Sequence, residues 1–168
     1  LRAFGLECNV SSSMQNNPLD LKNKIVSDAL KRKKSDDTLE IIANFGDPMM
    51  PVCAGMLSSA SKNCHVILAG GTQMLAVLQL AKHIGYDAKN SAIGCTSYIV
   101  DDSQAKFLET LEQIDNLAVL SCDPGLHNSQ HFGFRSYADG FVKEGAGAGG
   151  AIIASLLKTE NSVAVSYT

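Results

Sequence analysis

Apolar residues recur at helical spacing in several parts of the chain. In residues 19–34 they fall on one side of a helix from Leu19 to Leu30. Residues 72–84 have the same character and are followed by Gly85, a residue that commonly ends helices. The pattern predicts helices at residues 19–34, 52–61, 72–84 and 101–114, and another that begins in the glycine-rich segment 145–150.

Short apolar runs alternate with these helices. The clearest is "CHVILAGG" at residues 64–71, which is continuous and rich in β-branched residues, as is typical of a strand buried on both faces. Residues 38–45 fit either a strand or the start of a helix. Further strands are predicted at residues 6–10, 91–100, 117–123 and 162–168, and a loop at residues 124–139.

This alternation of strands and helices predicts an α/β fold. We expect a mostly parallel sheet with helices on both faces, in the three layers of a Rossmann-like protein. The length of 168 residues suits a single domain, residues 1–168. Ligands bind such sheets beyond the carboxyl ends of the strands, so the loops that follow the strands are the first places to look for a site.

The first residues, "LRAFG", look like the last turn of a helix and its glycine cap, and no initiator methionine precedes them. We therefore expect the chain to be a piece of a longer protein.

Charge and cysteine content narrow the classes of partner. The net charge of −3 implies no broad basic surface, so no nucleic-acid partner is expected. The basic run at residues 30–34 is interpreted as the solvated end of a helix. Five cysteines without a C-x-x-C pair favour reduced thiols and a cytoplasmic protein. No apolar run approaches the roughly 20 residues that span a bilayer, so no membrane partner is expected.

One candidate site is the turn "AGGTQ" after the run at residues 64–71. Gly70 and Gly71 would let backbone N–H groups approach a ligand, and the start of the next helix favours an anion. A tight turn with Thr72 as the helix N-cap explains the same residues equally well. The polar segment "SSSMQNNP" allows two interpretations in the same way, because its hydroxyls and amides can hold a phosphate or simply bond to one another.

A second candidate is "KEGAGAGG". Glu144 stands directly before a glycine-rich helix start, where a carboxylate can act as a general base and the glycines leave room for a ligand. A capping acid on a helix packed closely against the sheet is the alternative. Four further candidates lie around the end of the run at residues 117–123, namely Cys122, Asp123, His127 and His131. Because Pro124 and Gly125 interrupt helical spacing, we interpret the histidines as hydrogen-bonding groups at a site and not as metal ligands.

The segments "GDPMMPVCAGM", "VILAGGTQMLAV" and "GFVKEGAGAGGA" together resemble the nicotinate-nucleotide–dimethylbenzimidazole phosphoribosyltransferases, in particular their archaeal and cyanobacterial branch. The resemblance covers nearly the whole chain. It implies a single phosphoribosyltransferase-like domain, here the carboxyl-terminal half, without the family's upstream nucleotide-binding segment. It also implies transfer of the phosphoribosyl group of nicotinate mononucleotide to a benzimidazole-type base, which gives α-ribazole phosphate and nicotinate.

The resemblance further implies roles for individual residues. Glu144 corresponds to the general base, and Lys22 to the lysine that meets the nucleotide phosphate. The resemblance implies no metal or other cofactor, and it implies a homodimer. The remaining residues that the resemblance places at the substrate are Ser11, Ser12, Ser13, Gly70, Gly71, Thr72, Thr96, Ser97, Gly145 and Gly147.

Two alternatives stand beside this hypothesis. The chain could be a nucleotide- or phosphate-binding module that has kept the fold and lost turnover. It could also be an unrelated doubly wound enzyme, although the absence of a G-x-G-x-x-G fingerprint counts against that.

Overall fold

A computed structural model describes residues 1–10, 18–141, 147–159 and 165–167. Its centre is a four-stranded sheet in the order β1-β2-β3-β4. The strands are β1 (Val66–Ala69), β2 (Ser91–Thr96), β3 (Ala118–Cys122) and β4 (Val165–Tyr167). The first three strands run parallel and β4 is antiparallel to β3, which confirms the predicted α/β class with a mostly parallel sheet.

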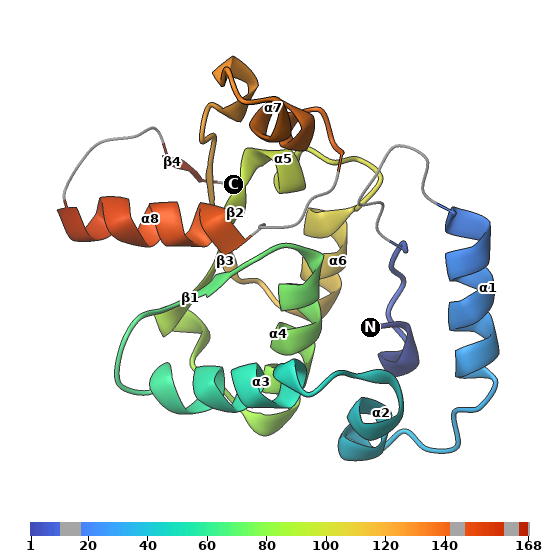
Figure 1. Ribbon diagram of the computed structural model, residues 1–168. Helices are drawn as coiled ribbons and strands as arrows, with labels where there is room; N and C mark the ends of the chain where they lie inside the picture. The colour runs from blue at the N-terminus through green and yellow to red at the C-terminus, as the bar shows by residue number, and fades with distance from the viewer. Residues whose placement is uncertain (11–17, 142–146, 160–164, 168) are drawn as a thin grey trace.

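The helices lie on both faces of this sheet (Figure 1). One face carries α8, which packs against all three parallel strands, while α3, α4 and α6 pack together on the other. The α-helices of the described residues are α1 (Leu19–Leu30), α2 (Thr38–Phe45), α3 (Met49–Ala60), α4 (Thr72–Ile84), α5 (Ser97–Val100), α6 (Phe107–Ile114), α7 (Phe132–Ala138) and α8 (Gly147–Thr159). Short 3₁₀ turns are η1 (Arg2–Phe4), η2 (Ala88–Asn90) and η3 (Leu126–Asn128).

The hydrophobic core fills the space between the sheet and the α3, α4 and α6 layer. Leu78 of α4, Ile93 of β2 and Ile114 of α6 are all at most 1% exposed. Burying side chains of this size contributes roughly 1.5–3 kcal/mol each, so this layer supplies much of the drive to fold. None of the helices that the structure describes is long and apolar enough to cross a membrane.

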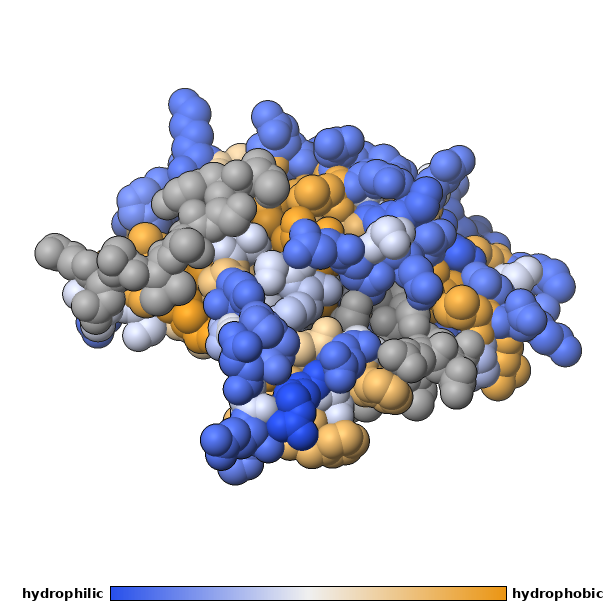
Figure 2. Space-filling view, turned by 90° about the horizontal axis from the view of Figure 1, so that it is seen from above, coloured by the Kyte–Doolittle hydropathy of each residue, from blue (hydrophilic) through white to orange (hydrophobic). Residues whose placement is uncertain are grey.

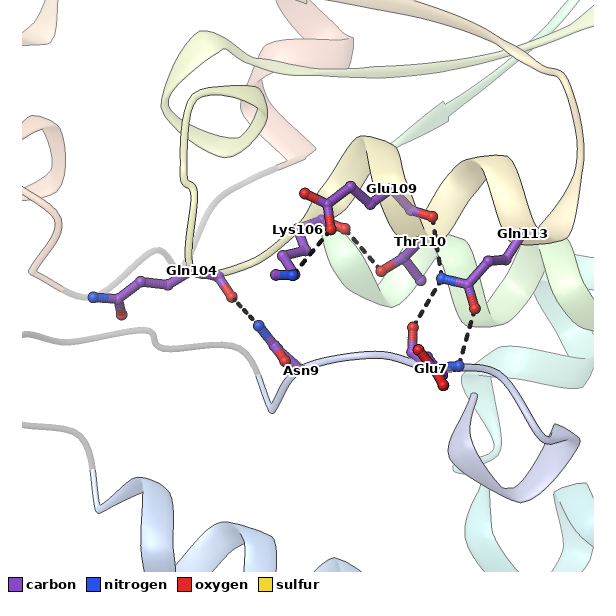
Figure 3. Close-up of polar contacts among 7 residues, drawn as sticks. All are labelled: Glu7, Asn9, Gln104, Lys106, Glu109, Thr110 and Gln113. Atoms are coloured by element: carbon purple, nitrogen blue, oxygen red, sulfur yellow. Dashed lines mark hydrogen bonds and ion pairs between the residues drawn. The ribbon is translucent and has the colours of Figure 1, made fainter.

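The strand predicted at residues 6–10 is wrong, because no neighbouring strand pairs with this segment. Side chains satisfy its backbone instead (Figure 3). The Gln113 amide accepts from the Glu7 N–H at 3.0 Å and donates to the Glu7 carbonyl at 2.9 Å. Asn9 donates to the Gln104 carbonyl at 3.0 Å. The first residues are thus held to α6 by amide groups and lie outside the sheet.

Other boundaries differ from the predictions as well. The helix predicted at residues 19–34 ends at Leu30, and the one predicted at residues 52–61 begins at Met49. The strand predicted at residues 91–100 ends at Thr96, and the helix α5 follows. The helix predicted from residue 101 begins at Phe107, after Lys106 adopts a left-handed conformation with φ 48°. The loop predicted after β3 contains η3 and α7. Residues 38–45, for which the pattern left two options, form a helix that the Asp37 side chain caps.

Candidate functional site

The carboxyl ends of the parallel strands meet at one edge of the sheet. Ala69, Thr96 and Cys122 end β1, β2 and β3, and the parallel register aligns these ends. Seen from above, this side of the molecule carries apolar side chains between polar ones (Figure 2). This is the edge at which ligand sites of α/β sheets form.

The turn after β1 is tight. The Gly70 N–H donates to the Gly94 carbonyl at 3.0 Å. A Cβ atom on Gly70 would lie 2.6 Å from Cγ of Met74, so the Met74 side chain would have to shift to accept a larger residue here. The proposed N-cap role of Thr72 is wrong, because Gly71 is the N-cap and Thr72 is the first residue of α4. The first turn of α4 leaves backbone N–H groups directed at the sheet edge.

A hollow of about 350 Å³ separates α1 from this turn, and Val26, Thr72 and Gln73 contribute to its walls. Lys22 lies one turn before Val26 and therefore on the same face of α1. Its side chain has no hydrogen-bond or ion-pair partner within the described part of the chain. Lys22 thus shares a face of α1 with Val26, but it is not itself among the residues that line this hollow.

The glycines at the start of α8 allow it to approach the strands directly. A Cβ atom on Gly149 would lie 2.2 Å from the carbonyl carbon of Cys95, and one on Gly150 would lie 2.7 Å from Cα of Ala69. At Gly147 the nearest atom would be the Ala69 carbonyl oxygen at 3.3 Å. Close packing against the sheet therefore explains Gly149 and Gly150, while Gly147 sits where α8 reaches the end of β1.

A large hollow of about 900 Å³ lies where β2, β3, α7 and α8 come together. Thr96 and Pro124, which end or follow strands, line it together with Ala148 of α8. The rest of the wall is mainly aromatic and comes from α7 and its flanks. The aromatic lining residues are His131, Phe132, Phe134, Tyr137 and Phe141. A volume of this size is within the range of small-molecule sites.

Hydroxyl groups lie at the strand side of this hollow. Thr96 is 1% exposed, and its Oγ1 lies 3.4 Å from the Tyr137 hydroxyl. Tyr137 in turn contacts the ring of Tyr98 edge to face, with centroids 5.8 Å apart. Ser97, which follows Thr96, begins α5 and is half-buried. Thr96 at the end of β2, Tyr98 of α5 and Tyr137 of α7 therefore share one polar and aromatic cluster.

A polar network extends from Tyr98 to the end of β3. The Tyr98 hydroxyl donates to Asp123 Oδ1 at 2.9 Å and lies 3.4 Å from Nδ1 of His127. The Gly125 N–H also donates to Asp123. This backbone hydrogen bond, followed by the Tyr98 hydroxyl, lowers the pKa of the Asp123 carboxyl, and burial together with Asp123 raises the pKa of Tyr98. The carboxylate and the phenol both stay in the forms that hold the network at neutral pH.

Of the two histidines that follow β3, one joins this hydrogen-bond network and the other lines the large hollow. His127 contacts Tyr98 and Asn128, and His131 borders the large hollow. Within the described ranges, no group of three or more His, Cys, Asp or Glu side chains could hold a metal ion. Cys122 is buried and directs its thiol toward the Cys95 and Gly149 carbonyls, away from these histidines.

Five predicted site residues lie outside the described residues, namely Ser11, Ser12, Ser13, Glu144 and Gly145. The described residues on both sides of Glu144, Phe141 and Ala148, line the large hollow. The sequence predictions did not include Phe132, Phe134 and Tyr137. Their only signal is the closely spaced aromatic residues of "HFGFRSY", in a segment predicted to be a loop.

No model of a known protein family matches the chain. It is similar to UPF0284 proteins of several archaea. It is 42% identical over 159 residues to the protein from Methanosarcina mazei, and the aligned region covers 90% of this chain and 46% of that protein. The protein from Archaeoglobus fulgidus is 41% identical over 150 residues, with 89% of this chain and 42% of the relative covered. The one from Pyrococcus abyssi is 40% identical over 157 residues, with 90% and 46% covered.

These comparisons carry two consequences. The chain spans about half the length of the curated relatives that it matches. The shared name, UPF0284 protein, states no activity.

Proposed function

We propose that the chain is the carboxyl-terminal part of a phosphoribosyltransferase. It would transfer the phosphoribosyl group of nicotinate mononucleotide to a benzimidazole-type base and release nicotinate. The observation that carries the proposal is the large hollow at the carboxyl end of β2. Two described residues near Glu144 in the chain, Phe141 before it and Ala148 after it, contribute to the wall of this hollow. The motif around Glu144 resembles the segment that carries the family's general base, and this resemblance supports the same assignment.

The proposed chemistry needs few residues. A ring nitrogen of the base forms a bond to C1′ of the ribose, and the bond from C1′ to the nicotinate nitrogen breaks. The bonding electrons neutralise the pyridinium ring, so the leaving group needs no proton. The proton that the acceptor base loses goes to the Glu144 carboxylate. The ribosyl carbon develops positive charge during the transfer, which nearby dipoles and carboxylates stabilise.

The nucleotide would lie along the ends of β1 and β2. These strands are neighbours, and their ends carry the turn Gly70–Thr72 and the pair Thr96 and Ser97. The first turn of α4 favours a phosphate. Lys22, one turn before Val26 on α1, would supply a positive charge to the phosphate. Gly147 begins α8 beside the Ala69 carbonyl at the end of β1, and the next residue, Ala148, lines the large hollow. Positioning of the two reactants would supply much of the rate.

The test uses the full-length protein with nicotinate mononucleotide and a panel of bases, including 5,6-dimethylbenzimidazole and adenine. Free nicotinate and the ribotide product are measured. We expect product with the wild type and a loss of at least about 100-fold in kcat for Glu144→Gln, the usual scale for removing a general base. Glu112→Gln, at an exposed position in α6, is the matched control and should keep full activity.

The outcomes separate the hypotheses. Nucleotide binding without product in the wild type would favour a binding module that has lost turnover. Full activity of Glu144→Gln would remove this residue from the mechanism while leaving the reaction in place. A homodimer is also proposed from the family resemblance, and analytical ultracentrifugation of the full-length protein tests it.

A further inference from the structure

Residues 126–139 contain η3 and α7, and we call them the η3–α7 segment. They supply much of one wall of the large hollow, although none of them is buried. Among the described elements, α7 packs closely only against η3. Phe132 and Phe134 line the hollow and are still 78% and 53% exposed. His131 lines it too, and its ring contacts that of Phe134 with centroids 5.8 Å apart. A segment with so few buried contacts opens locally at low free-energy cost.

The η3–α7 segment keeps its own shape through internal bonds and is flanked by two glycines. The Arg135 guanidinium donates to the Ser129 carbonyl at 2.6 Å, which ties α7 to the residues just before it. Gly125 precedes the segment with φ 66°, and Gly140 follows it with φ 83°. Both values lie in the left-handed region that glycine adopts without strain. Glycines on both sides of a unit that holds together internally are suited to be hinges, because they absorb changes in backbone angle.

Tyr98 of α5 joins the η3–α7 segment to the sheet at two points. Its hydroxyl lies 3.4 Å from Nδ1 of His127 in η3, and its ring contacts that of Tyr137 in α7 edge to face. The same hydroxyl donates to Asp123 Oδ1 at 2.9 Å, which fixes the side chain at the end of β3. The Tyr137 hydroxyl in turn lies 3.4 Å from Oγ1 of Thr96 in the wall of the hollow. One side chain therefore connects the strand ends with both the η3 and the α7 part of the segment.

We propose that Tyr98 is a positioning residue that holds the η3–α7 segment as a cover, and that this cover closes over a small molecule in the large hollow. Gly125 and Gly140 are the hinges of the movement. Closure buries the exposed rings of Phe132 and Phe134 against the bound molecule, and burial of apolar surface favours the closed position. It also keeps water away from the strand ends. This role rests on the proposed function only in that a small molecule enters the hollow.

Hydrogen exchange of the full-length protein, read by mass spectrometry, tests the cover. In the free protein, residues 126–139 should exchange at least about tenfold faster than the buried middle of α4. The probe for the hollow is Nile red, an uncharged aromatic dye that fluoresces more strongly in apolar surroundings. Binding of the dye should slow exchange in residues 126–139 by at least about tenfold and leave α4 unchanged. Exchange in this segment as slow as in α4, or a dye that leaves it unchanged, would overturn the cover.

Two variants test the role of Tyr98. Tyr98→Phe keeps the ring contact with Tyr137 and loses the hydroxyl, so exchange in residues 126–139 and dissociation of the dye should both become about threefold faster. Tyr98→Ala loses the ring as well and should change both rates further. Tyr86→Phe is the matched control, because the Tyr86 hydroxyl donates to Asp115 instead, and it should change neither rate.

The dye dissociation rate separates positioning from a general loss of stability, because a cover controls the exit of a bound molecule. Unchanged dissociation and unchanged exchange in Tyr98→Phe and Tyr98→Ala would overturn the role of Tyr98. If Tyr98→Ala does not fold, Tyr98→Phe decides by the same two rates. None of these measurements needs turnover. If the dye slows exchange as expected and the wild type forms no product, the proposed reaction fails and the cover stands.

Discussion

The backbone of Gly149 in α8 lies directly against that of Cys95 in β2, and a Cβ atom on Gly149 would be 2.2 Å from the Cys95 carbonyl carbon. Neither partner can give way easily, because the contact joins the backbone of a packed helix to the backbone of the central sheet. A glycine at this position is therefore a condition for bringing the start of α8 to the sheet edge.

We predict that Gly149→Ala lowers the free energy of unfolding by about 1–3 kcal/mol, the usual cost of overpacking. Gly55→Ala is the matched control, because Gly55 also lies in a helix but a Cβ atom there would meet nothing within 4 Å. That substitution should raise stability by up to about 1 kcal/mol. Urea denaturation of both variants checks the prediction, and equal effects would contradict the packing argument.

The Tyr98 hydroxyl is predicted to hold the Asp123 carboxyl in its charged form. Tyr98→Phe removes a hydrogen bond to the carboxylate, so the pKa of Asp123 should rise toward its ordinary value. Carbon-detected NMR titration of the carboxyl group measures the change. Tyr86→Phe, whose hydroxyl donates to Asp115 instead, should leave the Asp123 titration unchanged.

The same pair has a consequence for stability. A carboxyl group with a lowered pKa in the folded protein contributes stability above its unfolded pKa, about 3.9 for aspartate. That contribution is lost as the pH falls through the folded pKa. The stability difference between wild type and Tyr98→Phe should therefore be present at neutral pH and close below about pH 4. A difference that persists at pH 2 would assign the effect of Tyr98 to packing.

Gln113 is predicted to hold the first residues in place. Its amide makes two hydrogen bonds with the Glu7 backbone (Figure 3), so Gln113→Ala should increase hydrogen exchange at the Glu7 amide. The loss of stability should be about 0.5–1.5 kcal/mol. Gln113→Glu keeps the acceptor and loses the donor, and it should protect the Glu7 amide better than Gln113→Ala does. Equal exchange in all three proteins would count against this contact.

The five cysteines are predicted to react with an alkylating reagent at very different rates. Cys64 is exposed, whereas Cys95 and Cys122 are buried. Burial raises the pKa of Cys95 to about 12, so little thiolate forms there at neutral pH. Peptide mapping after brief treatment should find Cys64 modified, with Cys95 and Cys122 modified only after unfolding. Rapid modification of Cys95 in the folded protein would contradict the packing of α8 on β2.

Several elements could be predicted from local pattern. The sequence predicts β1 from its apolar run and α4 from its amphipathic pattern and the Gly85 that ends it. Both patterns are clear because burial within the sheet, or against it, restricts which residue each position can carry. The segment at residues 6–10 could not be placed in the same way. A β-strand forms only where the backbone of a neighbouring strand pairs with it. Here the Gln113 side chain makes the hydrogen bonds to the Glu7 backbone instead. The short α7 has no buried residue to produce a helical stripe.

For the candidate site, too, some features could be predicted from the sequence and others could not. The sequence determined the order of strands and helices, and with it the turn at Gly70 and Gly71, because these follow from chain connectivity and apolar spacing. The end of β2 at Thr96 did not follow from that spacing, which continues to Val100. Only the tertiary structure decided that α7 stands over β2, that Phe134, Tyr137 and Thr96 share one hollow, and that Gly149 and Gly150 serve close packing. Those relations join residues that are far apart in the chain, and they depend on which surfaces remain to be covered once the sheet has formed.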